Sequence, residues 1–413
     1  MMNEVTTAEP RNEVQSNSNT KILLLSWEYP PNVVGGLSRH VHGLAGGLSQ
    51  MGYEVHVLTA NPGHLSAYEI IDGIHIHRVR PLKENDHNFL HWILGLNLAM
   101  EQKARELSSC HSFELVHAHD WLVGPCGLTL KESLKLPLIT TIHATEHGRN
   151  NGIYTELQKF IHEKEEQLVN GSDHVIVCSE YMKEEVIQQF KISEEKLAVI
   201  ANGINKEIPL KNPDDLLSGL PVKESGRLIF SIGRMVKEKG FDILIESAPI
   251  IKEKFSDAYF IIAGKGPMLE TYRKRVKELN LEDFIHFPGF IDDMQRSALF
   301  HKCAFAVFPS HYEPFGIVAL EAMISGKPAI VSNTGGLKGI VKHGYSGLLM
   351  IPGDSASFAE QASYLLGNAD RANTIGANGK KVAESLFSWG RIAEETKRVF
   401  EETLISQKLE DLV

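Results

Sequence analysis

The stretch from Ala304 to Met323 reads AFAVFPSHYEPFGIVALEAM and indicates the fold of the chain around it. Ala304 to Phe308 form an apolar run that predicts a buried strand, and a helical pattern runs onward from Phe315. A buried strand that leads through a polar loop into a helix is the repeating unit of a parallel α/β sheet. Glu313 is therefore expected at the carboxyl end of a strand, and Glu321 about two turns into the next helix.

Glu313 and Glu321, eight residues apart, also suggest a binding site. In an open α/β sheet, ligands bind at the carboxyl ends of the strands. Two carboxylates facing such a crevice suit a polyhydroxy ligand, because each ionised carboxylate accepts several hydroxyl donors. The alternative is an ordinary loop glutamate and a solvated helix glutamate, since most glutamates lie at the surface.

The same alternation of short apolar runs and amphipathic segments continues through most of the chain and is typical of β-α-β units. The strands predicted in the first half are Lys21–Ser26, Glu54–Leu58, Ile74–Val79, Leu115–His117, Leu138–Ile142, His174–Cys178 and Leu197–Ile200. The strands predicted in the second half are Leu228–Ile232, Tyr259–Ala263, Ile285–Phe287, Phe305–Phe308, Ala329–Val331 and Gly347–Met350. Helical patterns such as Leu37–Met51, Phe89–Leu107 and Tyr154–Val169 lie between strands. We therefore expect an α/β protein with parallel sheets.

A break in this pattern divides the chain. Residues 202–226 are rich in Pro, Gly, Asn and Asp and lack periodicity, so they predict a linker between domains. We expect two Rossmann-like, doubly wound domains that face a cleft, residues 21–201 and 227–386. Residues 387–413 are helical without a following strand, and we expect this helix to pack toward the first domain.

Composition excludes several classes of protein. A length of 413 residues favours two domains, and 43% hydrophobic with 23% charged residues is typical of a soluble globular protein. The formal net charge of −10 argues against a nucleic-acid partner, which requires a basic face.

Targeting signals and cysteine pairs are also not evident. The 4 cysteines are scattered and form no Cys-x-x-Cys, so we expect neither a zinc site nor a disulfide framework among them, and we infer a reducing compartment. Residues 1–20 are polar, unlike a signal peptide, and predict a disordered tail. Because no apolar run approaches the ~20 residues that span a bilayer, we expect a cytoplasmic protein, with peripheral membrane contact left open.

Two pairs of glycines precede helical patterns and could approach an anion. Gly35 and Gly36 follow the first strand, and Gly335 and Gly336 follow Ser-Asn-Thr after a strand of the second half. Glycine lets the backbone come close to a ligand, and a helix N-terminus offers amides and a positive dipole end to phosphate. Glycine before a helix is also common without a ligand.

Arg234 and Lys239 lie just beyond a strand at the start of the second domain, in a glycine-bounded loop. They could converge on a diphosphate, because Arg supplies a planar fork of donors and Lys a compact charge. A solvated basic turn is the alternative. The segment Gly264-Lys-Gly266 is not a nicotinamide fingerprint, since Leu269 stands where a third glycine is needed.

Polar residues also follow two strands of the first half: His119 and Asp120 after one, and His143, Glu146 and Arg149 after the next. They are expected in the same crevice. Although such a cluster invites a metal, the chain contains no Asp-x-Asp, a common ligand pair for a metal that holds a diphosphate. We therefore expect no metal or other cofactor, and expect Arg, Lys and helix ends to neutralise the charge.

Together these segments resemble the retaining glycosyltransferases with the GT-B fold, a family that includes the glycogen and starch synthases. The resemblance covers nearly the whole chain after the tail, and Glu-Pro-Phe-Gly with a second glutamate eight residues on is its most specific part. His143-Ala-Thr-Glu-His-Gly-Arg-Asn150 is most similar to the glycogen-synthase-like branch. The resemblance implies a hexosyltransferase, with glucose from UDP- or ADP-glucose as the expected donor and a glycan or lipid as the acceptor.

The resemblance also implies roles for the motif residues. The catalytic residues would be His143, Arg234, Lys239 and Glu313. The donor-binding residues would be Gly35, Gly36, Phe315, Gly316, Glu321, Gly335 and Gly336. The acceptor side would hold His119, Asp120, Glu146 and Arg149. Within this scheme Glu313 grips hydroxyls of the donor sugar and Glu321 those of the ribose.

Some positions depart from the family pattern. Asn205 and Gly339 stand where acidic residues are usual, and Val33 and Val34 precede Gly-Gly where bacterial glycogen synthases carry Lys. The sequence therefore does not specify ADP-glucose or an α-glucan. Two alternatives stay open: a UDP-sugar epimerase that needs no acceptor, and a nucleotide-sugar-binding protein without turnover.

Overall fold

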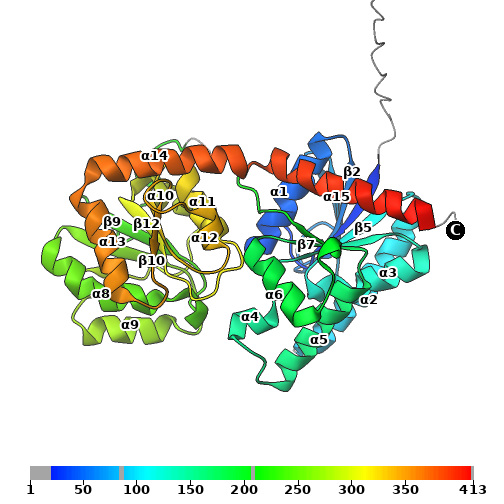
Figure 1. Ribbon diagram of the computed structural model, residues 1–413, viewed down its shortest axis with the longest axis horizontal. Coiled ribbons are helices and arrows are strands. Elements are labelled where there is room, and N and C mark those ends of the chain that lie inside the picture. Colours follow the sequence, from blue (N-terminus) through cyan, green and yellow to red (C-terminus); the bar gives the residue numbers. More distant parts are fainter. Residues whose placement is uncertain (1–19, 83–87, 206–209, 411–413) are drawn as a thin grey trace, which may run out of the picture.

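The computed structural model describes residues 20–82, 88–205 and 210–410, which form two α/β domains side by side (Figure 1). The predicted disordered tail, residues 1–20, lies outside the described residues except for Thr20. Each domain is built on one largely parallel sheet with helices on both faces, which confirms the predicted fold class.

The described part of the first domain contains an eight-stranded sheet in the order β3-β4-β2-β1-β5-β6-β7-β8. Its strands are β1 (Lys21–Leu25), β2 (Glu54–Ala60), β3 (Tyr68–Ile71), β4 (Ile74–Val79), β5 (Leu115–His119), β6 (Leu138–Ile142), β7 (His174–Val177) and β8 (Leu197–Val199). Its helices are α1 (Gly36–Gln50), α2 (Phe89–Ser108), α3 (Gly124–Leu134), α4 (Glu146–Asn150), α5 (Glu156–Gly171) and α6 (Glu180–Phe190). Neighbouring residues of β1 point to opposite faces: Ile22 and Leu24 pack with α1, whereas Leu23 and Leu25 pack in the core beneath α2 and α3.

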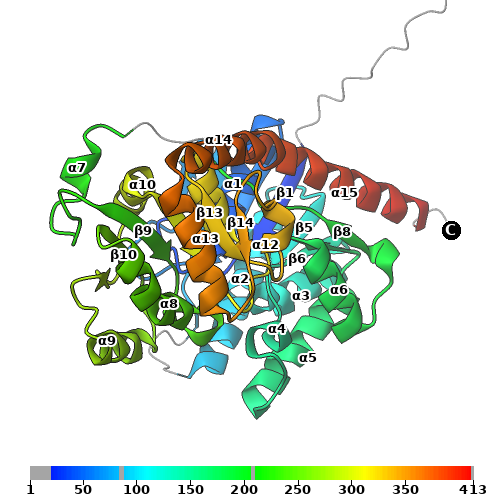
Figure 2. The ribbon, with the colours of Figure 1, turned by 60° about the vertical axis from the view of Figure 1, so that its left-hand side comes forward.

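The second domain has a six-stranded parallel sheet among its described residues, in the order β11-β10-β9-β12-β13-β14. Its strands are β9 (Arg227–Ile232), β10 (Ala258–Ala263), β11 (Ile285–His286), β12 (Phe305–Phe308), β13 (Ala329–Ser332) and β14 (Leu348–Met350). Its helices are α8 (Phe241–Lys254), α9 (Leu269–Glu278), α10 (Asp293–Lys302), α11 (Ile317–Ile324), α12 (Leu337–Ile340), α13 (Ser355–Gly367) and α14 (Ala369–Leu386). Helices α8, α9 and α13 share one core, and Figure 2 shows α13 lying across β13 and β14. Helices α10 and α11 cover the other face.

The segment between the domains contains one short helix in its described part, α7 (Pro213–Leu216). Residues 206–209 of the predicted linker lie outside the described residues. Leu217 is 5% exposed and packs in a core cluster, so part of this segment is held against the protein.

Two details differ from the sequence-based expectation. Strand β3 was not predicted; it is antiparallel to β4 and joins it through Asp72 and Gly73, both in the left-handed region. Most of its side chains are exposed, so it lacks the buried alternation that marks a strand. Helix α11 begins at Ile317 rather than at Phe315, because Gly316 has φ of 112° and cannot belong to a right-handed helix.

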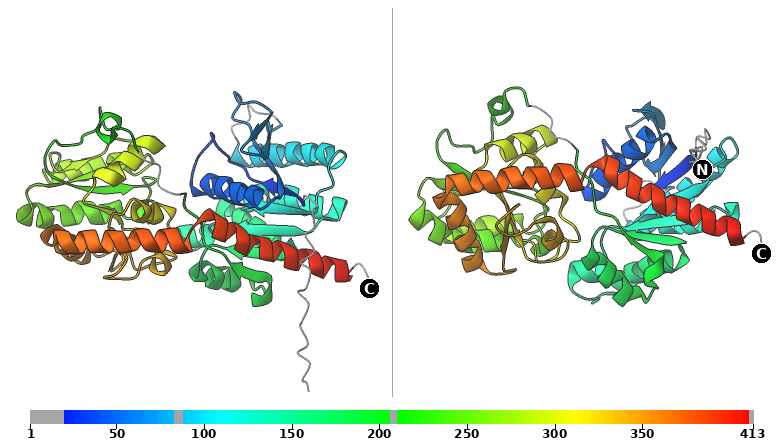
Figure 3. Two further views of the ribbon diagram at one scale, coloured as in Figure 1. Left: turned by 90° about the horizontal axis from the view of Figure 1, so that it is seen from above. Right: turned by 45° about the horizontal axis from the view of Figure 1, so that its top comes forward.

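The final helix, α15 (Trp389–Glu410), follows α14 and leaves the second domain to lie against the first (Figures 1 and 3). It packs on α1, and its buried residues Ile392, Ala393 and Phe400 join the core of the first domain. The close approach of α15 to α1 depends on Gly43 of α1, because a β-carbon at this position would overlap the indole ring of Trp389.

No helix in residues 20–82, 88–205 and 210–410 has the length and apolar character to cross a bilayer. The cysteines are all free: Cys126, Cys178 and Cys303 are buried and Cys110 is exposed.

We expect Gly43→Ala to lower the free energy of unfolding by about 1–3 kcal/mol, because the added methyl overpacks the contact between α1 and Trp389. Gly46→Ala is the matched control on the same helix, since no atom lies within 4 Å of the position its β-carbon would take. That change should be neutral or raise stability by up to about 1 kcal/mol. Urea denaturation measures both, and equal responses would contradict the packing of α15 on α1.

Candidate functional site

A cavity of about 580 Å³ lies between the two domains, at the carboxyl ends of both sheets. Its first wall is formed by the segments that follow β1, β5 and β6, and its second wall by the segments that follow β9, β10 and β12. This is the position at which open α/β sheets bind ligands.

An ion pair between Lys239 and Glu313 lies in the second wall. Lys239 ends the short turn between β9 and α8, and its Nζ atom is 2.6 Å from Oε2 of Glu313 in the loop after β12. Ser310 Oγ, 3.4 Å away, donates to the same carboxylate oxygen. Glu313 is only 9% exposed, so its position depends on these partners.

Arg234 lies in the same wall, where the cavity opens to solvent. Its guanidinium is 3.3 Å from Glu238 and its side chain is 58% exposed, so this pair is loose and solvated. The carbonyl of Glu238 accepts a 2.8 Å hydrogen bond from the amide of His311, which joins the turn after β9 to the loop after β12. Arg234 and Lys239 therefore both border the cavity, and a diphosphate could bind between them.

The loop that carries Glu313 contacts the first domain on both sides of this residue. The hydroxyl of Tyr312 donates to Glu185 at 3.2 Å, and Ser179 Oγ donates to the carbonyl of Pro314 at 2.7 Å. Glu185 lies in α6, and Ser179 is the residue that caps the start of this helix. The first domain thus fixes the backbone around Glu313.

Glu321 is bound by arginines from both domains. Its Oε1 atom is 3.2 Å from Arg296 of α10 and 3.6 Å from Arg39 of α1. Asp293 bridges the same two arginines at 3.0 Å and 2.8 Å. Oε2 of Glu321 is buried without a hydrogen-bond partner among the described residues, so it can accept a ligand hydroxyl. Neither Arg39 nor Arg296 was predicted as a site residue.

Gly35 and Gly36 border the cavity at the start of α1, but part of this helix terminus is occupied. The buried carboxylate of Glu28 accepts hydrogen bonds from the amides of Val34, Gly35 and Ser38. Burial also raises the pKa of Glu28. A phosphate at this helix terminus could therefore bond only to the amides that do not donate to Glu28. Glu28 was missed because it lies before the helix, whereas a capping-box glutamate occupies the third helical position.

The glycines near Glu313 have different roles. Gly316 and Phe315 border the cavity as predicted. Gly335 and Gly336 do not line it: a β-carbon on either would overlap the backbone of the Glu313 loop, and the amide of Gly336 donates to the carbonyl of Glu313 at 2.9 Å. The predicted second anion nest is therefore a close contact between two backbone segments.

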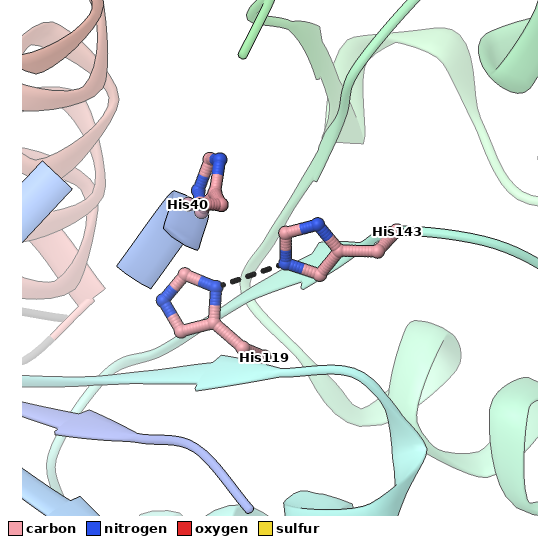
Figure 4. A group of neighbouring side chains, drawn as sticks. All are labelled: His40, His119 and His143. Carbon is pink, nitrogen blue, oxygen red and sulfur yellow. Dashed lines mark hydrogen bonds between the residues drawn. The ribbon is translucent and has the colours of Figure 1, made fainter. Parts of the chain in front are cut away.

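His143 lies in the first wall, directly after β6. Its amide donates to Oδ1 of Asp120 at 2.7 Å, and its Nε2 atom is 3.2 Å from Nδ1 of His119 (Figure 4). His40 of α1 lies across the pair, with its ring 4.7 Å from that of His143 and its Nδ1 atom 2.7 Å from Oδ1 of Asn202. His119 has no exposed surface, so it positions His143 and cannot make the predicted acceptor contact in this geometry.

Burial sets the charges of this group. Burial raises the pKa of Asp120 to about 6, opposed by Arg149 and by backbone amides. Burial, reinforced by Arg149, lowers the pKa of His143 to about 3. His143 is therefore neutral at pH 7 and can exchange hydrogen bonds with a hydroxyl but cannot serve as a strong acid. His40, His119 and His143 each offer one ligand atom, and these atoms lie within 4.8 Å of one another, so this group could hold a metal ion.

A groove of about 920 Å³ adjoins the cavity. Arg149, Glu238 and Tyr312 line both the groove and the cavity. Polar residues of α4 and α6 line the groove on the side of the first domain. Glu146, predicted on the acceptor side, does not line either space; its carboxylate accepts a 3.0 Å hydrogen bond from Asn150. Arg149 is thus the predicted acceptor-side residue with access to both spaces.

Glu165 of α5 supports this side of the cleft and was not predicted. Its two carboxylate oxygens accept from the amide of Glu146 at 2.9 Å and 3.1 Å, which fixes the start of α4. Glu165 is 2% exposed, and burial raises its pKa to about 8.

Two protein-family models match this chain. The model of glycosyltransferase family 4 matches residues 34–208, and the model of glycosyl transferases group 1 matches residues 215–382. The two matches correspond to the two walls of the cavity.

Known proteins are similar over nearly the full length. An uncharacterised glycosyltransferase from Methanocaldococcus jannaschii is 36% identical over 92% of this chain and 97% of its own. A glycogen synthase from Mycobacterium tuberculosis is 33% identical over 92% of this chain and 94% of its own. The catalytic domain of starch synthase IV from Arabidopsis thaliana, solved with ADP and acarbose, superposes with a TM-score of 0.74 at 16% identity, covering 94% of this chain and 100% of that domain. The two-domain arrangement is the GT-B fold.

The raised pKa of Glu165 predicts a dependence of stability on pH. Between pH 4.5 and about 8 the folded state keeps a proton that the unfolded state has released, so this group lowers stability as pH rises. Glu165→Gln removes this effect, because glutamine does not titrate. Its stability relative to the wild-type protein should therefore increase by up to about 1.4 kcal/mol for each pH unit in this window. Urea denaturation at several pH values measures this difference. Glu166→Gln, an exposed change on the same helix, should show no such trend, and a flat difference for Glu165→Gln would contradict the assignment.

Proposed function

Because this chain belongs to the glycosyltransferases that combine the family 4 and group 1 domains, we propose that it is a retaining hexosyltransferase. In this proposal it transfers glucose from UDP- or ADP-glucose to a hydroxyl of a glycan or another acceptor. The observation that carries the proposal is the convergence of Lys239, Glu313, Arg234 and Glu321 on one cavity between the domains.

The donor would bind mainly to the second wall. Lys239 and Arg234 neutralise the diphosphate, with the remaining amides at the start of α1 facing it from the first wall. Glu313, held by Lys239, accepts hydrogen bonds from hydroxyls of the sugar. The unpaired Oε2 atom of Glu321 accepts from the ribose, while Arg296 and Arg39 hold its other oxygen.

Catalysis follows from where charge develops. As the anomeric bond breaks, the diphosphate gains negative charge and the sugar becomes cationic. Lys239, held by Glu313, and Arg234 stabilise the first of these changes, and the carboxylate of Glu313 stabilises the second. In this proposal the leaving phosphate accepts the proton of the acceptor hydroxyl on the same face of the sugar, so configuration is retained. The neutral imidazole of His143 bonds a hydroxyl of the transferred sugar.

No metal is required in this scheme, because side chains and helix amides supply the positive charge. The acceptor would enter along the groove that adjoins the cavity, where Asn150, Asn151, Gln188 and Gln189 present amides suited to sugar hydroxyls. Arg149, at the junction of the two spaces, would face the acceptor near the reacting hydroxyl.

The direct test is a panel of UDP-, ADP- and GDP-sugars with glycan acceptors, read by nucleotide release and by NMR of the product. We expect release with UDP- or ADP-glucose that depends on the acceptor, and a product with the anomeric configuration of the donor. Formation of a new sugar from the donor alone would instead indicate an epimerase. Donor binding in calorimetry without transfer to any acceptor would indicate a protein that has lost turnover.

We expect Lys239→Ala and Arg234→Ala each to lower kcat by about a hundredfold or more, since one such electrostatic donor contributes about 3 kcal/mol to a transition state. Steady-state kinetics with the preferred donor measures this effect, and circular dichroism verifies the fold. Lys274→Ala removes an exposed lysine, 81% accessible, from α9 of the same domain and should leave kcat unchanged. Near-normal turnover of either cleft variant would refute the assignment of the diphosphate site.

A further inference from the structure

A second group of histidines lies at the opposite end of the first sheet from the cleft. Glu54 is the first residue of β2, and His56 follows on the same side of the strand. His75 of β4 pairs with His56 in the register of the two parallel strands. His111 lies in the segment that leads into β5. These four residues therefore meet where strands begin, while the cleft lies where strands end.

The carboxylate of Glu54 is the centre of this group. Its Oε1 atom is 3.1 Å from Nε2 of His56 and 3.7 Å from Nδ1 of His111. Glu54, His56 and His75 each offer one ligand atom, and these three atoms lie within 4.8 Å of one another. Lys21 of β1 also reaches Oε1 of Glu54, at 2.9 Å, and its side chain is 31% exposed.

Further side chains hold the imidazole rings in place. Nδ1 of His56 is 3.1 Å from Nε2 of His77, and the hydroxyl of Tyr68 is 2.9 Å from Nδ1 of His75. The ring of Phe113 packs edge-on against His56 at 5.1 Å between centroids. Such outer partners orient metal-binding imidazoles, and an apolar cover raises the strength of the bonds they make.

One ring nitrogen of this group is open to a ligand. The side chain of His56 is fully buried. Nδ1 of His111 is buried without a hydrogen-bond partner among the described residues. Imidazoles beside one carboxylate are a donor set that zinc takes when no thiolate is present.

We propose that Glu54, His56, His75 and His111 form a zinc-binding site that joins β2, β4 and the segment before β5. A tetrahedral site with bonds of about 2.0–2.1 Å places its ligand atoms about 3.4 Å apart. The separations from Glu54 to His56 and to His111, 3.1 Å and 3.7 Å, lie close to this value, and the cation would take the place of Lys21 beside Glu54.

The site is structural and independent of the proposed sugar transfer, because it lies at the other end of the sheet. Zinc bound to the folded state stabilises it by mass action. Protein freed of metal by EDTA should therefore keep its kcat at low temperature and lose part of its thermal stability.

The test is isothermal titration of metal-free, full-length protein with ZnCl₂, together with the melting temperature with and without zinc. We expect one zinc ion to bind at this site and to raise the melting temperature. His75→Gln and His111→Gln, both at partly exposed positions, should each weaken zinc binding by at least about tenfold. His64→Gln removes an exposed imidazole of the same domain and should bind zinc as the wild-type protein does.

The histidines near the cleft provide the competing outcome. Zinc binding that is unchanged in His75→Gln and His111→Gln but lost in His40→Gln would overturn the proposal and place the metal beside His143. Should the glutamine variants fail to fold, anomalous diffraction from zinc-soaked wild-type crystals decides. A zinc peak bonded to Glu54 and His56 supports the site, and the absence of one overturns it.

Discussion

The ion pair between Lys239 and Glu313 is the interaction around which the cleft is organised. A largely buried charge pair needs both partners in place, since removing either leaves a charge that water cannot fully solvate. Three hydrogen bonds keep Glu313 where Lys239 can reach it. The amide of Gly336 donates to the carbonyl of Glu313, and the hydroxyl of Tyr312 and the carbonyl of Pro314 bond to α6 and its capping residue in the first domain. Strands β9 and β12, which carry the two loops, are neighbours in the sheet. The order of the strands and the contact between the domains together place Nζ of Lys239 2.6 Å from Oε2 of Glu313.

Ion pairs across the cleft join the two domains beside the proposed donor site. Arg39 of the first domain reaches both Asp293 and Glu321 of the second. The carboxylate expected to hold the ribose is therefore oriented by both domains before a donor arrives. A formal charge of −10 over the whole chain says nothing of this local arrangement, in which Lys239 is paired with Glu313 and Arg234 with Glu238.

Most strands and helices could be predicted because their signals are local. Buried strands such as Leu138–Ile142 are continuous apolar runs, and helices such as Phe89–Ser108 show an apolar period near 3.6. Strand β3 could not be predicted, since its exposed residues gain their place only by pairing with β4. The start of α11 was missed by two residues because the left-handed Gly316 ends the loop, a conformation that sequence periodicity does not report.

The sequence alone determined the α/β class, the order of most elements and part of the set of residues that face the cleft at strand ends, because each depends on local periodicity and on the rule that parallel strands end at one edge. The tertiary structure decided what those residues do there. It put Glu28 on the helix terminus that looked open to phosphate, used Gly335 and Gly336 for backbone contact, and buried His119 behind His143. It also brought Arg39 to Glu321 across the two domains. Each of these outcomes depends on distances between segments far apart in the chain, which no local pattern encodes.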